Sequence, residues 1–167
     1  MGEKMTGGTS VFQLDSYRPK KNVGRPSDFH QLTEYLIESP SLKWWSKITN
    51  RMKVLLNLEV GWDGYRGKPV SFENAIFALK VLETVCPNTA PEPQIVPGSN
   101  GDLQIEWHIH GVDIELDILA PNKVNFWISN AETGEEGKEV PLTTNFVSVA
   151  DEMKKLSNHQ NDQATAA

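Results

Sequence analysis

Residues 103–118 read LQIEWHIHGVDIELDI, and the arrangement of the predicted domain follows from them. Apolar and polar residues alternate strictly on both sides of Gly111. A repeat of two residues is typical of a strand with one buried face. A two-residue turn at His110-Gly111 would join the two runs into an antiparallel hairpin, with Ile109 opposite Val112. The apolar residues of both strands then lie on the same side of the sheet.

One strand is predicted before this hairpin and one after it. Residues 94–97 form a short predicted strand. Pro97 restricts this strand to the edge of the sheet, because proline has no N–H to donate to the hydrogen-bond ladder. Alternation returns over residues 124–128, which predicts a fourth strand. We therefore predict a four-stranded antiparallel meander over about residues 94–129, followed by an acidic loop at 134–137.

The apolar spacing changes to three and four residues ahead of the strands, which is typical of helices. A short helix is predicted to begin at Asp28. A second begins at Ser39-Pro40, since serine is a good cap and proline suits the first helical position. A third is capped by Ser71 and ends at Pro87.

A final helix is predicted after the strands, with Thr143 or Thr144 as its cap. The chain order is thus helices, four strands and a helix. The sheet has one apolar face that the helices can cover, which predicts a single two-layer α+β domain over residues 28–157. We expect residues 1–27 to form a flexible basic tail and residues 158–167 to be disordered.

The composition limits the functions to consider. The chain has 167 residues, of which 38% are hydrophobic, and its net charge is −6. No apolar run could span a bilayer and no secretory signal follows Met1, so we expect a cytoplasmic protein without membrane contact. The single cysteine, Cys86, rules out an internal disulfide, and its place in a helical stripe predicts burial.

The charge is unevenly distributed along the chain. Residues 59–119 hold ten acidic residues against three basic ones. Phosphate contacts need Lys and Arg, so nucleic-acid binding is not expected except through the tail, with Lys20, Lys21 and Arg25. We expect that tail to fold back on the acidic body instead. An acidic body suits a protein partner with a basic surface.

The hairpin registers gather polar residues on the outer side of the sheet. They place His108 opposite Asp113, and Glu106 opposite Glu115. A match of Ile118 with Val124 leaves a loop at residues 120–122 and brings Trp127 beside Glu115. The predicted outer set, called here the acidic face, comprises Glu106, His108, Asp113, Glu115, Asp117 and Trp127.

Three interpretations of the acidic face remain open. It could be a solvated surface, because exposed charges usually are. It could bind a partner, with Trp127 as the anchor. It could hold a metal ion or share protons, as in a small metal-dependent enzyme that uses His108, Asp113 and Glu106 or Glu115.

The sequence GWDGY at residues 61–65 is a second candidate site. Asp63, Tyr65 and Arg66 could present an acid, a hydroxyl and a cation to a partner. Alternatively, Trp62 and Tyr65 fill one end of the core while Asp63 bonds backbone amides in the turn.

No Ser-His-acid pattern, Cys-His pattern or phosphate-binding glycine loop is present, so we predict no catalytic residue, no metal and no cofactor. The segments GWDGYRGKPVS and PEPQIVPGSNGDLQIEWHIHGVDIELDI resemble a family of small bacterial proteins with no established activity. The resemblance implies a bacterial or phage source, with a link to mobile elements, and assigns no catalytic residue. We predict a non-enzymatic protein-binding module, such as an antitoxin, immunity or anti-defence factor.

Overall fold

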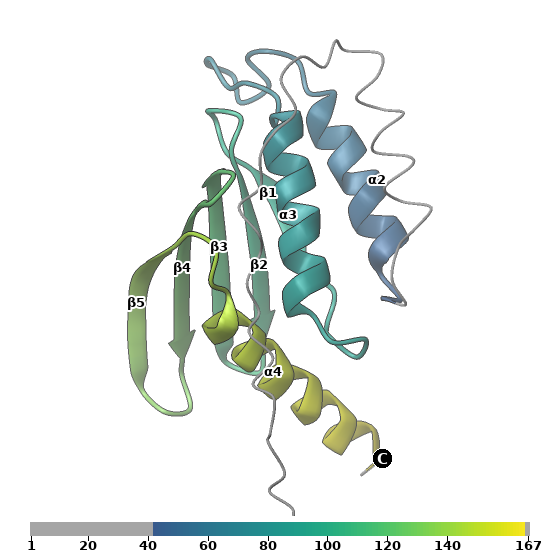
Figure 1. Cartoon of the computed structure of the whole chain (residues 1–167), viewed down its shortest axis with the longest axis vertical. Coiled ribbons are helices and arrows are strands. Elements are labelled where there is room, and N and C mark those ends of the chain that lie inside the picture. The colour runs from purple at the N-terminus through teal and green to yellow at the C-terminus, as the bar shows by residue number, and fades with distance from the viewer. Residues whose placement is uncertain (1–41, 166–167) are drawn as a thin grey trace, which may run out of the picture.

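The computed structural model describes residues 42–165, without the side chains of residues 135–136 and 159–165. This part of the chain forms three helices and one five-stranded antiparallel sheet (Figure 1), which confirms the predicted α+β class. The helix predicted from Asp28 and the tail at residues 1–27 lie outside the described residues. The elements in chain order are α2 (Trp45–Leu56), α3 (Phe72–Val85), β1 (Gln94–Pro97), β2 (Leu103–Ile109), β3 (Val112–Ala120), β4 (Lys123–Asn130), β5 (Glu135–Leu142) and α4 (Val147–Thr165).

Every strand pairs with its neighbour in the sequence, in the order β1-β2-β3-β4-β5. The predicted hairpin register is confirmed, with Ile109 opposite Val112 in the β2–β3 pair. The turn residues His110 and Gly111 both have positive φ, at 52° and 73°. Two such residues in succession are typical of the tight turn whose twist matches that of the flanking strands.

The predicted strand count is wrong, because residues 135–142 form a fifth strand instead of a loop. This strand pairs with β4, and Val140 lies opposite Phe126. The predicted three-residue loop is also wrong. Ala120 pairs with Lys123 after a register shift, which leaves a shorter turn than the expected 120–122 loop.

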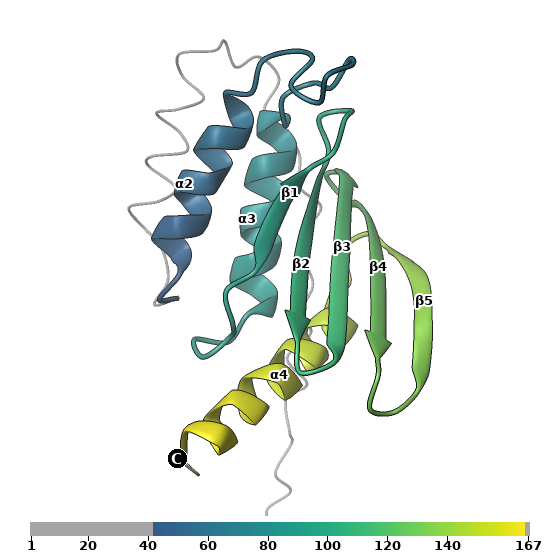
Figure 2. The ribbon, with the colours of Figure 1, turned by 180° about the vertical axis from the view of Figure 1, so that it is seen from behind.

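The helices lie on one side of the sheet, as Figures 1 and 2 show. Helix α3 contacts β2 and β3, α4 packs on α3, and α2 contacts both α3 and the edge strand β1. Buried aromatic residues fill the interface, among them Trp107, Phe77 and Phe146. Trp44 and Trp107 donate their indole N–H groups to the carbonyls of Ala90 and Pro91. In Figure 2 the strands lie in front, and no described helix covers their outer side.

The first residues of α3 and α2 compare with their predictions as follows in the described part of the chain. Helix α3 begins as predicted, with the Ser71 hydroxyl accepting from the backbone N–H of Asn74. Helix α2 begins at Trp45, whereas the start predicted at Ser39-Pro40 lies outside the described residues.

Helix α4 differs from its prediction at both ends. It begins at Val147, whose backbone N–H donates to Oδ1 of Asn145. Thr143 and Thr144 are therefore not its cap. It continues to Thr165, past the predicted domain boundary at residue 157. None of the described helices has the length and apolar content needed to cross a membrane.

Candidate functional site

The acidic face occupies the outer side of β2, β3 and β4. Each of its residues alternates with a buried neighbour along its strand, so the pleat turns its side chain away from the helices. The predicted pairs are present: His108 lies opposite Asp113 and Glu106 opposite Glu115. Trp127 lies opposite Glu115 in the next pair.

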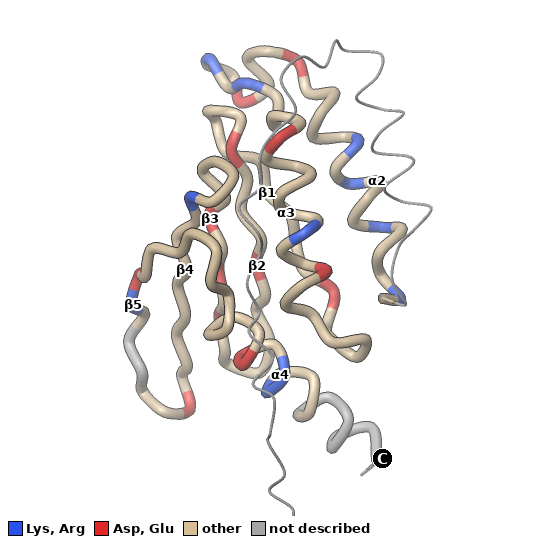
Figure 3. The backbone as a smooth tube through the Cα atoms, in the orientation of Figure 1, with Lys and Arg blue, Asp and Glu red and all other residues tan. Residues whose placement is uncertain are grey.

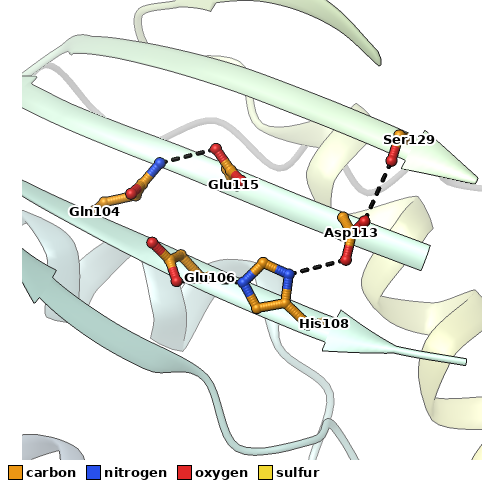
Figure 4. Close-up of polar contacts among 6 residues, drawn as sticks. All are labelled: Gln104, Glu106, His108, Asp113, Glu115 and Ser129. Atoms are coloured by element: carbon orange, nitrogen blue, oxygen red, sulfur yellow. Dashed lines mark hydrogen bonds and ion pairs between the residues drawn. The ribbon is translucent and has the colours of Figure 1, made fainter. Parts of the chain in front are cut away.

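His108 lies between two carboxylates at one end of this face (Figure 4). Its Nδ1 is 2.8 Å from Oδ1 of Asp113, and its Nε2 is 3.2 Å from Oε2 of Glu106. Only the doubly protonated ring can donate to both carboxylates at once. The hydrogen bond to Asp113 and then the one to Glu106 therefore raise the pKa of His108.

Glu115 and Asp117, the other carboxylates of the face, form no salt bridge among the described residues. Glu115 is hydrogen-bonded to a neutral side chain, since Nε2 of Gln104 donates to its Oε2 at 2.9 Å. Burial first, and the neighbouring charge of Glu106 second, raise the pKa of Glu115. Burial and then the charge of Glu139 raise the pKa of Asp117. The sequence has no Lys or Arg from residue 81 to residue 122, so the face retains uncompensated negative charge.

Trp127 is half-buried and held by the strand that the sequence did not predict. A Cβ built on Gly137 of β5 would collide with the indole ring, so the ring lies directly against the glycine backbone. Trp127 therefore covers the β4–β5 pair at the margin of the acidic face. The exposed part of the Trp127 ring is available for contact with a partner, while the rest of the ring packs on β5.

The GWDGY segment forms a tightly bonded loop. Oδ1 of Asp63 accepts from the backbone N–H groups of Tyr65 and Gly67, both at 2.9 Å. These bonds lower the pKa of Asp63. Nε1 of Trp62 donates to the carbonyl of Lys68 at 3.0 Å. The predicted role of Asp63 in the turn is confirmed.

One structural expectation for this loop is wrong. Tyr65 does not fill the end of the core, because 88% of its surface is exposed. Arg66 is exposed beside it. An aromatic residue next to a glycine turn indicates packing only on average, and the Asp63 bonds already close this loop without the phenol ring.

The loop and the acidic face are separate sites. The backbone N–H of Lys68 donates to the carbonyl of Ser99 at 2.9 Å, which ties the loop to the β1–β2 turn. His108 lies near the opposite end of β2. The sequence-predicted residues therefore form two groups, one on the sheet and one at the end of the molecule.

No three His, Cys, Asp or Glu residues in the described residues 42–165 are grouped so that they could hold a metal ion. Cys86 is buried as predicted, and burial raises the pKa of its thiol.

Comparison with protein-family models, curated proteins and solved structures finds no match to this chain. The resemblance carried by the GWDGY and PEPQIV segments therefore remains a prediction.

Proposed function

We propose that this protein is a non-enzymatic protein-binding module whose acidic face binds a partner with a basic surface. The proposal rests on one observation: a sheet side that no described helix covers carries several carboxylates and no Lys or Arg from β1 to β3. Antitoxin, immunity and anti-defence factors are small proteins that act by binding, and we propose this kind of role.

The electrostatics of the face favour such a partner. Glu106 and Glu115 lie directly opposite each other, an arrangement that disfavours both charges. Cations supplied by a partner would relieve this repulsion and accelerate association. The strands hold the carboxylates in fixed positions, so little conformational freedom is lost on binding.

The test compares two charge reversals that change the net charge equally. A partner is first captured from the source cells with the full chain and identified. Its affinity is then measured for the unchanged protein, for Glu115→Lys on the acidic face, and for Glu132→Lys in the exposed β4–β5 turn. We expect Glu115→Lys to weaken binding at least about tenfold and Glu132→Lys to leave it within about twofold.

Thermal melts of both variants accompany the titration, because a misfolded variant would also lose binding. A Glu115→Lys variant that melts normally and binds normally would remove the acidic face as the binding site. Equal losses in both variants would indicate a general charge effect, and would also contradict the proposal.

A further inference from the structure

One stretch of the described chain is rich in basic residues. Residues 42–69 contain six basic residues and two acidic ones, although the whole chain carries −6. Figure 3 shows blue along most of α2 and no red on that helix, blue and red in the loop that follows it, and red on β2 and β3. The net charge therefore conceals a basic surface. Its cations are Lys43, Lys47, Arg51, Lys53, Arg66 and Lys68.

The solvent side of α2 has the chemistry of a phosphate-binding surface. The helix contains no acidic residue, and its exposed positions carry serine, asparagine, lysine and arginine. Such side chains supply most protein contacts to phosphate and sugar. Val54 is the one large hydrophobic residue exposed on this helix. A protein–protein interface would need more apolar area at its centre.

Two of these cations are positioned by the neighbouring edge of the sheet. Nε of Arg51 donates to the carbonyl of Ile95 at 3.0 Å, which uses one of the three guanidinium nitrogens. Nζ of Lys47 lies 2.7 Å from Glu92, but the Lys47 side chain remains 70% exposed. An exposed pair of this kind is worth little, so Lys47 can exchange Glu92 for a phosphate.

The loop adds an exposed aromatic ring beside further cations. Tyr65 is more exposed than any other large hydrophobic residue in residues 42–165, and the exposed cations Arg66 and Lys68 follow it in the chain. Asp63 accepts hydrogen bonds from two backbone N–H groups, and these bonds order the loop before any ligand binds. Ligand binding would therefore not have to order the loop.

We propose that α2, the exposed Lys43 just before it and residues 61–68 bind single-stranded nucleic acid, with the cations on its phosphates and Tyr65 stacked on a base. Proteins that bind single strands combine a basic track with aromatic rings that are tolerant of sequence. A duplex offers no unstacked base to Tyr65. This proposal is independent of the acidic face, because it concerns another surface with the opposite charge.

The test uses a fluorescent oligothymidylate of about 20 nucleotides, a length sufficient for a single-strand site. Its anisotropy is measured with the full chain. If four phosphates are contacted, the affinity should fall about 50-fold between about 50 mM and about 200 mM salt. Lys43→Glu/Arg66→Glu should weaken binding at least about tenfold at low salt.

The matched control reverses two exposed lysines elsewhere, in Lys123→Glu/Lys138→Glu. Both double variants have the same net charge, so a general charge effect would weaken them equally and overturn the proposal. No binding by the unchanged protein at low salt would also overturn it. Binding retained in full by Lys43→Glu/Arg66→Glu would place the contact in another part of the chain and contradict this assignment.

Tyr65→Ala tests the aromatic contact separately. We expect it to weaken binding of oligothymidylate at least about fivefold, while Tyr65→Trp restores it, because stacking contributes through the ring. Duplex DNA of the same length should bind more weakly and be insensitive to Tyr65→Ala. Equal binding of duplex and single strand, with no effect of Tyr65→Ala, would overturn the single-strand assignment.

Discussion

The indole ring of Trp127 in β4 lies against the backbone of Gly137 in β5, with no room for a methyl group on the glycine. Glycine weakens a strand because it has no side chain to pack. A large aromatic ring from the neighbouring strand supplies the missing contact. The outermost strand of the sheet is therefore held through its glycine as well as through its ladder of hydrogen bonds.

Gly137→Ala should destabilise the protein. Its methyl group would collide with Trp127, so either the ring or β5 must move, and overpacking of this kind typically costs about 1–3 kcal/mol. Urea unfolding measures the change, with Lys138→Ala in the same strand as the control. Stability equal to that of the unchanged protein would mean that the ring does not occupy this position.

His108 should make stability depend on pH. Its pKa is raised by Asp113 and Glu106, so its contribution is complete below the pKa of the unfolded state and is lost as pH rises through that of the folded state. The protein should therefore unfold at higher urea at pH 6 than at pH 8. The group is largely exposed, so the difference is at most about 1 kcal/mol.

The variant His108→Gln should flatten this pH dependence, and His110→Gln in the adjacent turn should preserve it. The comparison uses the difference in unfolding free energy between pH 6 and pH 8 within each variant. Glutamine at positive φ adds a penalty at position 110 that is the same at both pH values and cancels in this difference. A steep dependence in His108→Gln would assign the effect to another group.

Asp63→Ala should loosen the loop at residues 61–68. The backbone N–H groups of Tyr65 and Gly67 lose their acceptor, so their hydrogen exchange should accelerate and the melting temperature should fall. Asp63→Asn keeps one acceptor oxygen and should lie between Asp63→Ala and the unchanged protein. Unaltered exchange at both amides in Asp63→Ala would show that the glycines alone define the loop.

Cys86 should be inert toward thiol reagents in the folded protein. The thiol is buried in the core, and burial raises its pKa, so the reactive thiolate is scarce. Reaction with an aromatic disulfide reagent should require unfolding and should appear promptly in concentrated urea. Rapid stoichiometric reaction without denaturant would contradict the burial of Cys86.

Most of the sheet could be predicted because its strands alternate cleanly. The pairing of Glu106 with Glu115 followed from the apolar faces and one short turn. The fifth strand could not be predicted, because EEGKEVPL contains glycine, proline and four charges and reads as a loop. It is an edge strand, and its pairing with β4 overrides its weak propensity.

The two candidate sites differed in how far the sequence could describe them. The contacts of His108 follow from register, which alternation determines. The exposure of Tyr65 does not, because sequence shows that a loop contains an aromatic residue but not which way its ring points. The basic stretch at residues 42–69 can be counted in the sequence, but its role as a surface cannot, because sequence does not show which side of α2 faces solvent.

The sequential order of the strands has a consequence for how the protein folds. Every strand pairs with the one next to it in the chain, so each hairpin closes across a short connection. Such pairings involve little sequence separation, and low contact order correlates with rapid folding. The β2–β3 hairpin combines a two-residue turn with a register that has no shift, so it is suited to nucleate the sheet. The helices would then condense on an apolar surface that is already assembled.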